Sequence, residues 1–486
     1  MKAPERQTKI IATIGPATES DKMLESLICE GVDVMRLNMA HASHQWIREI
    51  TERIRRIGKK VNREPAILMD VKGPEIRTGY LQTSVCLKRG DLIDLVFTTQ
   101  PEPPKIDEVW QIEVNYDKLH EHVKSGNNVL LDNGLIPLLV VEISPQKVRC
   151  RVLQDAELKS RRHVNLPGIE TGLPSITEKD RLDTLVGIEC EHDFFALSFT
   201  RDADAIDLFK SFLKDNDSKA QVIAKIEDQQ GVSNLEEIVS AADGLMIARG
   251  DLGIECPFEE LPIIQRKSVS VCLAKGKPVI VATHLLESMI ESPVPTRAEI
   301  SDVANAINEE ADCVMLSGET TTGLYPIECV RMLKRISSRI ERELPPVLSE
   351  SLRLFRPKAK MLRSAALLAL RMENAAVLVF TRSGDLAAKL GALRPNGAPL
   401  YAFTDIPGLH RRLRLIWGIE PFLMEFSQDP EQTIQEAIKR LINEERVDTG
   451  DQIVTVTNVL ADGKVVESIQ LREVDEMLKL ADSKAK

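Results

Sequence analysis

Short apolar runs alternate along most of the chain with longer segments in which apolar residues recur at helical spacing. The runs are rich in β-branched residues and end at charged or polar positions, which is typical of buried parallel strands in an α/β fold. Eight strand–helix units are predicted, with strands that begin near residues 9, 32, 66, 194, 222, 244, 278 and 312. Capping-box patterns at Ser233–Glu236 and Thr296–Glu299 predict two of the helix starts. Eight such units predict a (β/α)8 barrel.

Two segments depart from this alternation. Between roughly Gly73 and Asn165 the chain consists of short β-rich runs separated by turn residues, which indicates a β domain inserted into a loop of the barrel. Prolines at 345, 346 and 357 mark a linker, after which strands and helices alternate again. The predicted fold is a (β/α)8 TIM barrel of residues 1–73 and 166–345, an inserted β-barrel lid domain of residues 74–165, and a carboxyl-terminal α/β domain of residues 346–486.

Carboxylates stand at the ends of two neighbouring predicted strands. Lys225 and Glu227 follow one strand, a helix intervenes, and Asp251 follows the next strand. Parallel strands joined in this way end at the same edge of the barrel, where such folds assemble their active sites. Two carboxylates at one point favour a hard divalent cation, and Mg2+ is the default because no His or Cys completes a zinc or iron set. For these three residues alone, an ordinary salt-bridge cluster at the rim is the alternative.

Composition and charge narrow the class of protein. The net charge of -11 and the aromatic content of 4% argue against a nucleic-acid-binding protein. No apolar run approaches the ~20 residues of a membrane span, and the amino terminus has no signal or transit pattern, so we expect a cytoplasmic protein without a membrane partner. The eight cysteines form no CxxC pair and several fall within apolar runs, which favours reduced core thiols.

Eight short strings carry a further signal. They are TKIIATIGPA at residue 8, VMRLNMAHAS at 34, MDVKGPEIRTG at 69, VNLPG at 164, AKIED at 224, MIARGDLGIE at 246, VATHLLESMIESPVPTRAEISDVANAI at 281 and VMLSGET at 314. In this order and spacing they resemble the pyruvate kinase family along essentially the whole chain. The resemblance implies a barrel with an inserted mobile β domain and a carboxyl-terminal α/β domain, and also a homotetramer, the usual assembly of the family.

The activity that the resemblance implies is the transfer of the phosphoryl group of phosphoenolpyruvate to ADP, a step of glycolysis that gives ATP. It releases enolpyruvate, which is then protonated to pyruvate. By resemblance, Glu227 and Asp251 would hold Mg2+, for which Mn2+ can substitute. Lys225 would stabilise the moving phosphoryl group and the enolate left behind. The amides of Gly250 and Asp251, together with Thr283, would cradle the substrate carboxylate.

Protonation of the enolate carbon completes the reaction. Thr283 and Ser317 are expected to organise the water that supplies the proton. Neither side chain is a strong acid, so water rather than a side chain is the expected donor.

Arginines supply the phosphate and nucleotide contacts that the resemblance implies. Arg36 and Arg77 correspond to the family's phosphate and nucleotide clamps, a role that suits the planar guanidinium fork. The stretch from Asn38 to His41 would lie beside the nucleotide. Arg162 takes the place of a nucleotide contact that is usually a lysine, since RRH stands at residue 161 where the family has Lys-Lys-Gly. Rim salt bridges for the arginines and a solvated loop position for His41 are the alternatives.

The family also uses K+, but the predicted potassium shell departs from the family pattern. Its ligands fall on Asn38, Ala40, Asp70 and the backbone carbonyl of Val71, and Ala40 has no side-chain oxygen. Glu75 stands where potassium-dependent members carry an acid and independent members carry a lysine. We therefore expect K+ use, with water in place of the missing hydroxyl.

The carboxyl-terminal effector loop departs further. The sequence TRSGDL at residue 381 places Asp385 where family members activated by fructose bisphosphate carry another hydroxyl, and an aspartate repels a phosphate. The distal Trp and Gly-rich segment is replaced by VTNVLADGK at 456. We expect little activation by fructose bisphosphate. Thr381, Ser383 and Gly384 leave open a site for a simpler sugar phosphate or a mere helix cap.

Two alternatives to pyruvate kinase activity are a different barrel enzyme and a catalytically silent relative. A different magnesium-dependent barrel that acts on phosphoenolpyruvate or pyruvate, such as an aldolase or mutase, would need no ADP and would not explain an inserted domain able to close over a nucleotide. A catalytically silent relative would be expected to have lost the lysine or a metal-binding acid, whereas Lys225, Glu227 and Asp251 are all present.

Overall fold

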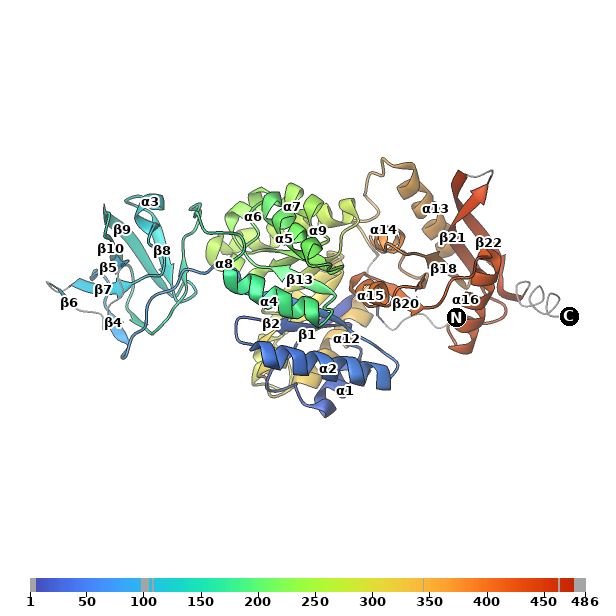
Figure 1. Ribbon diagram of the computed structural model, residues 1–486, viewed down its shortest axis with the longest axis horizontal. Coiled ribbons are helices and arrows are strands. Elements are labelled where there is room, and N and C mark those ends of the chain that lie inside the picture. Colours follow the sequence, from blue (N-terminus) through green and yellow to red (C-terminus); the bar gives the residue numbers. More distant parts are fainter. Residues whose placement is uncertain (1–5, 98–104, 107–108, 344, 462–463, 476–486) are drawn as a thin grey trace.

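The computed structural model describes residues 6–97, 105–106, 109–343, 345–461 and 464–475. Three lobes lie in a row along the longest axis of the molecule (Figure 1). The β-rich insert lies at one end, the barrel in the middle, and the carboxyl-terminal α/β lobe at the other end. This arrangement confirms the predicted fold class, and it places the insert and the carboxyl-terminal lobe on opposite sides of the barrel.

Eight parallel strands close the barrel, as the eight predicted units require. Neighbouring strands follow one another around it in chain order, and β17 pairs with β1 to complete the circle. Apolar side chains such as Ile223, Met246 and Ile280 are fully buried and pack together in one cluster. The strands are Lys9–Thr13 (β1), Val34–Asn38 (β2), Ala66–Val71 (β3), Phe194–Leu197 (β13), Gln221–Ile226 (β14), Gly244–Ala248 (β15), Val279–Ala282 (β16) and Cys313–Leu316 (β17).

Helices surround the barrel. Capping boxes were predicted at the starts of two of them, and one of these predictions is confirmed. Thr296 caps α10: its hydroxyl accepts from the Glu299 amide at 3.2 Å, and the Glu299 carboxylate accepts from the Thr296 amide at 2.7 Å. The prediction at Ser233 is wrong, because Asp228 caps α6 first and Ser233 lies in the last turn of that helix. The helices are Asp21–Glu30 (α1), His44–Lys60 (α2), Glu178–Glu189 (α4), Ala203–Asp215 (α5), Gln229–Ser233 (α6), Leu235–Ala241 (α7), Arg249–Glu255 (α8), Leu261–Lys275 (α9), Arg297–Asn308 (α10), Gly318–Thr321 (α11) and Pro326–Glu343 (α12).

Aspartates close the amino-terminal face of the barrel in a regular pattern. One aspartate immediately precedes every second strand, and its carboxylate accepts a backbone N–H from the strand before it at 2.9–3.0 Å. These hydrogen bonds satisfy backbone N–H groups at the strand ends that would otherwise lack partners inside the protein. This face is therefore structural, and the opposite edge is left for chemistry. The four pairs are Asp33 with Ile10, Asp193 with Ile67, Asp243 with Val222, and Asp312 with Val279.

The insert has its own sheet and its own buried core, separate from that of the barrel. Its main sheet has seven strands in the order β12-β8-β9-β10-β5-β7-β6, and β11 pairs with β4 beside it. The strands are Val85–Leu87 (β4), Leu92–Val96 (β5), Lys105–Ile106 (β6), Val109–Glu113 (β7), Asn128–Leu131 (β8), Ile136–Ser144 (β9), Lys147–Val152 (β10), Ala156–Leu158 (β11) and Val164–Asn165 (β12), with one short helix, Leu119–His122 (α3).

The carboxyl-terminal lobe packs on the amino-terminal face of the barrel. Arg411 donates to Asp193 at 2.8 Å, and Arg394 lies 2.9 Å from Asp312, so two of the strand-capping aspartates also anchor this lobe. Its sheet has the order β20-β19-β18-β21-β22, and β22 is a strand that the sequence pattern did not predict. The elements are Pro357–Arg371 (α13), Ala375–Phe380 (β18), Asp385–Gly391 (α14), Leu400–Thr404 (β19), Pro407–Arg412 (α15), Ile419–Leu423 (β20), Pro430–Asn443 (α16), Gln452–Ala461 (β21) and Lys464–Glu473 (β22).

Candidate active site

Lys225 lies at the centre of a buried polar cluster at the carboxyl-terminal edge of the barrel. Its Nζ donates to Ser198 Oγ at 2.7 Å and to Asp70 Oδ1 at 3.0 Å, and it lies 2.9 Å from Glu227 Oε1. Only 8% of Lys225 and 2% of Glu227 is exposed. An ammonium has three N–H bonds, and three oxygens surround this one. The structure therefore holds the lysine in one position.

The charges in this cluster shift one another's pKa values. Burial alone would lower the pKa of Lys225, but the carboxylates of Asp70 and Glu227 together outweigh it and raise this pKa. Burial raises the pKa of Glu227 above its usual range; Lys225 opposes that shift, whereas Asp251 and Asp70 add to it. Burial also acts to raise the pKa of Asp70, but Lys225 and Arg36 hold it below its usual value. Three carboxylates thus share two cations, and the remaining negative charge suits a divalent cation.

Gly250 and Asp251 open helix α8, which follows β15. The Gly250 N–H donates to Thr283 Oγ1 at 2.8 Å, and a Cβ at Gly250 would lie only 3.2 Å from His284 Nε2. Glycine therefore lets this backbone approach the loop after β16. Thr283 has a φ of 67°, in the left-handed region, and such strain is characteristic of functional loops. Glu227 follows β14 and Asp251 lies just after its parallel neighbour β15, and the Asp251 charge acts to raise the pKa of Glu227.

Arg36 belongs to the same cluster. Its Nε donates to Asp70 Oδ2 at 2.7 Å, and its Nη1 donates to Thr13 Oγ1 at 3.0 Å. The other oxygen of Asp70 accepts from Lys225, so this carboxylate holds both cations side by side. Two cations fixed at one edge provide a binding surface for a phosphorylated anion.

Ser317 lies in the loop that follows β17, one strand along from Thr283. The backbone N–H of Ser317 donates to Glu319 Oε2 at 2.8 Å. The other oxygen of Glu319 accepts from the Leu286 amide, in the loop after β16, at 3.1 Å. Glu319 therefore ties together the two loops that carry Thr283 and Ser317.

The predicted nucleotide contacts do not all lie at the barrel edge. Arg77 belongs to the insert, where its Nε donates to Glu75 Oε2 at 2.7 Å. Arg162 also belongs to the insert, and its Nη1 lies 3.3 Å from Asp132 Oδ1. His41 is an exposed residue in the loop after β2. The structure thus brings Lys225 and its neighbours together in the barrel, while both arginines are paired with acids of the insert.

Two residues near the site were not among the predicted functional residues. Ser198 follows β13, accepts from Lys225, and donates to the Val71 carbonyl at 2.8 Å. The rule that selected Lys225, a polar residue after a barrel strand, could have selected Ser198 as well. Burial lowers the pKa of His163, and the charge of Asp251 is among those that oppose this shift. His163 thus lies within electrostatic reach of the barrel site, and its position beside Arg162 is the signal that could have identified it.

The predicted potassium ligands are neighbours, but protein atoms already engage them. Asn38 pairs with Asp70 across β2 and β3, and its Oδ1 accepts from the Ala40 amide at 3.1 Å. The Val71 carbonyl accepts from Ser198 Oγ. In the part of the chain that the structure describes, no group of three or more His, Cys, Asp and Glu side chains could hold a metal ion. Any K+ or Mg2+ must therefore recruit substrate or water oxygens in addition to protein oxygens.

Comparison with known proteins decides the family. Residues 5–330 match the family model described as "Pyruvate kinase, barrel domain", and residues 359–465 match the one described as "Pyruvate kinase, alpha/beta domain". The chain belongs to the pyruvate kinase family. It therefore catalyses phosphoryl transfer from phosphoenolpyruvate to ADP, the pyruvate kinase reaction, and the family resemblance and the enzyme class predicted from the sequence are confirmed.

Individual pyruvate kinases that are similar to this chain agree with this assignment. Plastidial pyruvate kinase 2 of Arabidopsis thaliana is 37% identical over 481 residues, which span 96% of this chain and 81% of that protein. The pyruvate kinase of Sporosarcina psychrophila is 38% identical over 93% of this chain and 78% of its own length. The crystal structure of a pyruvate kinase from Cryptosporidium parvum superposes with a TM-score of 0.90 at 32% identity and covers 96% of both chains. Among the described helices, none is long and apolar enough to cross a membrane.

Proposed function

We propose that the cluster around Lys225 is the site of phosphoryl transfer, with Mg2+ bound between Glu227 and Asp251. The observation that carries this proposal is that Glu227, which is only 2% exposed, and Asp251 follow the paired parallel strands β14 and β15 at the same edge of the barrel. A hard divalent cation fits this set of oxygen donors, and Mn2+ fits it as a substitute. When bound, the divalent cation supplies positive charge that neutralises the carboxylate and phosphoryl oxygens of the substrate.

Lys225 and Arg36 would receive the phosphoryl group of phosphoenolpyruvate. Both cations are already fixed by Asp70, so little reorganisation is needed when the phosphate arrives. As the phosphoryl group leaves, negative charge develops on the enol oxygen, and the Lys225 ammonium stabilises that charge. The N–H groups of Gly250 and Asp251 would bind the substrate carboxylate, and Thr283 Oγ1, which accepts from Gly250 in the structure, would turn to donate to it.

The enolate carbon then takes a proton. We assign the organisation of the donating water to Thr283 and Ser317, whose loops Glu319 ties together. In the structure the Thr283 hydroxyl donates to the Ala282 carbonyl at 2.7 Å, and it would have to give up this bond to donate to the water. Water is the donor because neither hydroxyl is acidic enough to give up its proton at neutral pH.

The nucleotide would lie between the barrel and the insert. Asn38 and His41 approach it from the barrel, and Arg77 and Arg162 approach it from the insert when that domain closes. Before closure, Glu75 and Asp132 occupy the two arginines, so the nucleotide phosphates must displace these carboxylates. The proposed lid comprises residues 74–165, between barrel segments 1–73 and 166–345, and residues 346–486 form the third domain.

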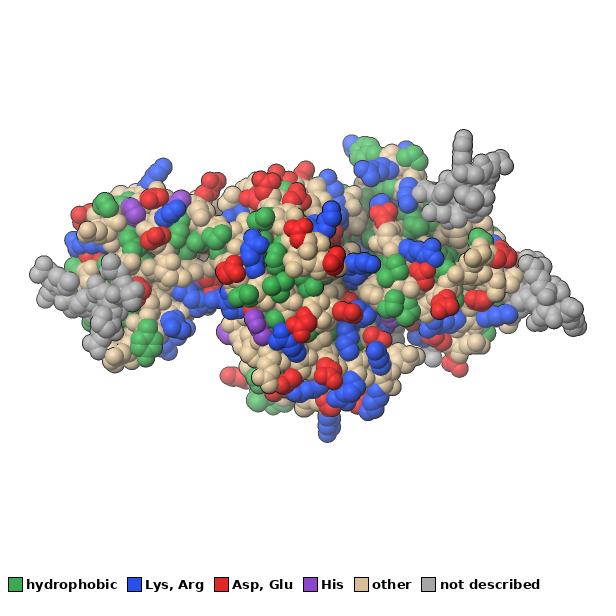
Figure 2. Space-filling model, in the orientation of Figure 1, with side chains coloured by type: hydrophobic (Ala, Val, Ile, Leu, Met, Phe, Trp, Pro, Cys, Tyr) green, Lys and Arg blue, Asp and Glu red, His purple; other side chains and the backbone are tan. Residues whose placement is uncertain are grey.

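The remaining assignments follow from the family. K+ would bind near Asn38, Asp70 and the Val71 carbonyl, where it supplies a further positive charge for the substrate. We propose a cytoplasmic homotetramer with no nucleic-acid partner. The charge distribution supports the last point: on the face drawn in Figure 2, Lys and Arg side chains are interspersed with Asp and Glu and form no continuous basic surface.

A steady-state assay tests the proposed site. Phosphoenolpyruvate, ADP and Mg2+ are supplied with and without K+, and pyruvate is measured by its reduction to lactate. We expect formation of lactate to require ADP and the divalent cation. A Glu227→Gln variant should require a higher Mn2+ concentration for half-saturation, measured directly by electron paramagnetic resonance. Unaltered Mn2+ binding in this variant would contradict the assignment of the metal site.

A further inference from the structure

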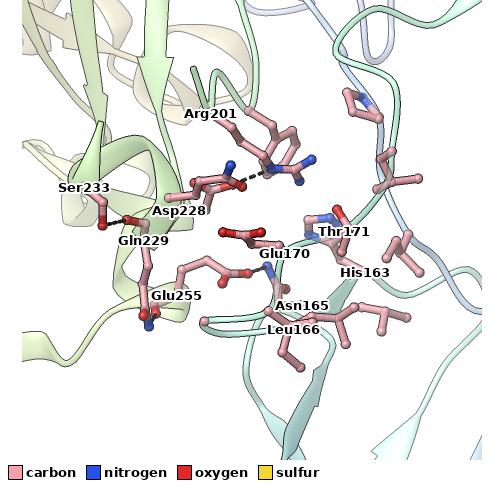
Figure 3. Close-up of a pocket in the computed structure, with 18 of the residues that line it drawn as sticks. His163, Asn165, Leu166, Glu170, Thr171, Arg201, Asp228, Gln229, Ser233 and Glu255 are labelled. Carbon is pink, nitrogen blue, oxygen red and sulfur yellow. Dashed lines mark hydrogen bonds and ion pairs between the residues drawn. The ribbon is translucent and has the colours of Figure 1, made fainter. Parts of the chain in front are cut away.

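A cavity of about 260 Å³ separates the insert from the barrel beside the active site (Figure 3). One wall comes from the segment that leaves the insert, with Asn165 and Thr171, and the other comes from the barrel, with Arg201, Asp228 and Glu255. The Arg201 guanidinium donates to Asp228 at 2.9 Å, so both residues are paired on the barrel side. The contact that crosses from wall to wall is made by Asn165 and Glu255.

Asn165 and Glu255 point toward one another in Figure 3. The Asn165 side-chain amide donates to Glu255 Oε1 at 2.9 Å, and the two residues are 3% and 8% exposed. Asn165 is the last residue of β12, which pairs with β8 in the sheet of the insert, and Glu255 is the last residue of α8 in the barrel. A hydrogen bond to a buried carboxyl group is among the stronger kinds, and breaking it leaves a buried polar group without a partner.

One further hydrogen bond and two close backbone approaches surround the same end of α8. A Cβ at Gly134, in the turn between β8 and β9 of the insert, would lie 3.4 Å from Ile254 on α8. The Gln229 side-chain amide donates to the Glu255 carbonyl, and a Cβ at Gly168 would lie 3.3 Å from Gln229 Oε1. The carboxyl end of α8 therefore lies close to the insert, to Gly168 in the segment that leaves the insert, and to Gln229 of the barrel.

The opposite end of α8 carries Gly250 and Asp251. The helix has seven residues, so its two ends are about 10 Å apart and joined by continuous backbone hydrogen bonds. A displacement of the insert that moves Glu255 would therefore also move the helix end that carries Gly250 and Asp251. The sequence placed Asp251 at the active site but gave no sign that the same helix reaches the insert.

We propose that Asn165 and Glu255 are positioning residues, and that their hydrogen bond couples the position of the insert to the metal- and substrate-binding end of α8. This inference rests on the proposed role of Asp251. Neither residue touches the reacting atoms. Their part is to keep α8 and the insert in a fixed relation, so that the substrate and the divalent cation meet a complete site.

Substitutions at Asn165 and Glu255 can either keep or remove the hydrogen bond between them. Glu255→Gln replaces one carboxylate oxygen with an amide group but leaves an oxygen that can accept from Asn165. Asn165 Oδ1, which is buried and has no hydrogen-bond partner, gives the new amide a possible acceptor as well. Glu255→Leu and Asn165→Leu both remove the bond. The glutamine variant should therefore rescue what the leucine variants lose.

Kinetics of the full-length enzyme provide the first test. In Glu255→Leu and Asn165→Leu we expect the KM for phosphoenolpyruvate and the half-saturating Mg2+ concentration to rise roughly tenfold, and kcat to change less than about threefold. Glu255→Gln should stay within about twofold of the wild type on all three. Equal effects of the glutamine and leucine variants, or no effect in either leucine variant, would overturn the proposal.

A matched control separates coupling from general instability. Gln265 and Glu309 form the same kind of buried pair within the barrel, with the Gln265 amide donating to Glu309 Oε2 at 2.8 Å. Glu309→Leu should lower the unfolding temperature and leave the KM for phosphoenolpyruvate within about twofold of the wild type. The same rise in KM in this variant would overturn the proposal.

Hydrogen exchange provides a second readout that does not depend on the assignment of Asp251. Amides of residues 163–173 should exchange faster in Glu255→Leu than in Glu255→Gln, whether or not substrate is present. Faster exchange with unchanged Mg2+ dependence would mean that the bond holds the insert but that α8 does not transmit its position, which would overturn the coupling. Unchanged Mn2+ binding in Asp251→Asn would instead contradict the proposed metal site itself.

Discussion

Lys225 and Glu227, two residues apart at the end of β14, form an ion pair with 2.9 Å between Nζ and Oε1. The same ammonium contacts Asp70 and Ser198, so it is bound on three sides by oxygens of the protein. A metal ion that binds Glu227 must share this carboxylate with Lys225. In the proposed mechanism the lysine therefore influences both the metal and the substrate.

Lys225→Met is expected to lower kcat at least about a hundredfold, because it removes the positive charge that faces the leaving enolate. Mn2+ binding should persist, since the variant also removes a cation that competes for Glu227. Stopped-time assays and electron paramagnetic resonance measure the two quantities. Lys9→Met is the matched control: Lys9 is also a buried lysine, but at the opposite end of the barrel, where it donates to the Ile419 carbonyl. Retained turnover in Lys225→Met would contradict the mechanism.

Arg36→Lys should raise the KM for phosphoenolpyruvate about tenfold or more. The guanidinium of Arg36 contacts Asp70 and Thr13 through different nitrogens, and a lysine has no planar fork with which to keep both contacts and bind a phosphate. Initial rates over a range of phosphoenolpyruvate concentrations measure the change. Arg55→Lys, at a buried aspartate on the amino-terminal face, serves as control and should leave the KM unchanged. A normal KM in Arg36→Lys would show that Arg36 has only a structural role.

The barrel was predictable because its strands are mainly apolar and polar residues lie at or near their ends. The helix start predicted at Ser233 was wrong because Asp228, whose side chain accepts from the Gly231 amide, begins a helix five residues earlier, although it lacks the Glu or Gln of a capping box. The strand β22 was missed because it follows β21 after a short gap and has mixed polarity.

The site was predictable in part for the same physical reason. Lys225 lies near the end of a strand, Glu227 and Asp251 follow strands, and strand ends meet in a barrel. The pairing of Arg36 with Asp70 could not be predicted, since it depends on side-chain orientations across two adjacent strands. Nor could the bond between Asn165 and Glu255, which are 90 residues apart and meet only when the insert packs on the barrel.

Replacement of K+ by tetramethylammonium should lower turnover, because this bulky organic cation is too large to be coordinated by the oxygens of a K+ site. Ala40→Ser should lower the half-saturating K+ concentration roughly threefold to tenfold by adding the hydroxyl that the shell lacks. The backbone amide of Ala40 already contacts Asn38, so the new hydroxyl would lie near the proposed ion. Ala42→Ser, in the same loop, is the control. Undiminished turnover in tetramethylammonium would contradict the expected use of K+.

Fructose bisphosphate is expected to shift the half-saturating concentration of phosphoenolpyruvate by less than about twofold. Asp385 stands in the effector loop, where Lys389 and Lys358 approach its carboxylate at 2.7 and 3.7 Å. Both lysines are therefore already paired with Asp385, and the aspartate itself repels a phosphate. One such repulsion is expected to weaken the binding of the sugar phosphate several-fold. Saturation curves with and without the sugar phosphate measure the effect. A large leftward shift of the curve would falsify this expectation.

His192 should make the enzyme less stable as the pH falls. The side chain is buried beside Thr51, 2.9 Å from its hydroxyl, and burial, with help from Arg55, lowers the pKa of His192 to about 3, against the opposing charge of Asp193. In the unfolded chain a histidine has a pKa of about 6.5, so its stabilising contribution is complete above that pH and is lost progressively as the pH falls toward 3.

At pH 5 this linkage costs about 2 kcal/mol relative to pH 7, since each pH unit below the unfolded pKa costs about 1.4 kcal/mol. Buried acids with raised pKa values, such as Glu255, act in the opposite direction over the same range, so the wild type alone does not isolate the effect. The measurement is the difference in free energy of unfolding between the wild type and His192→Gln in urea, taken at pH 7 and pH 5. The glutamine variant should lose less stability on acidification than the wild type, and an equal loss in both proteins would show that His192 takes up its proton in the folded state.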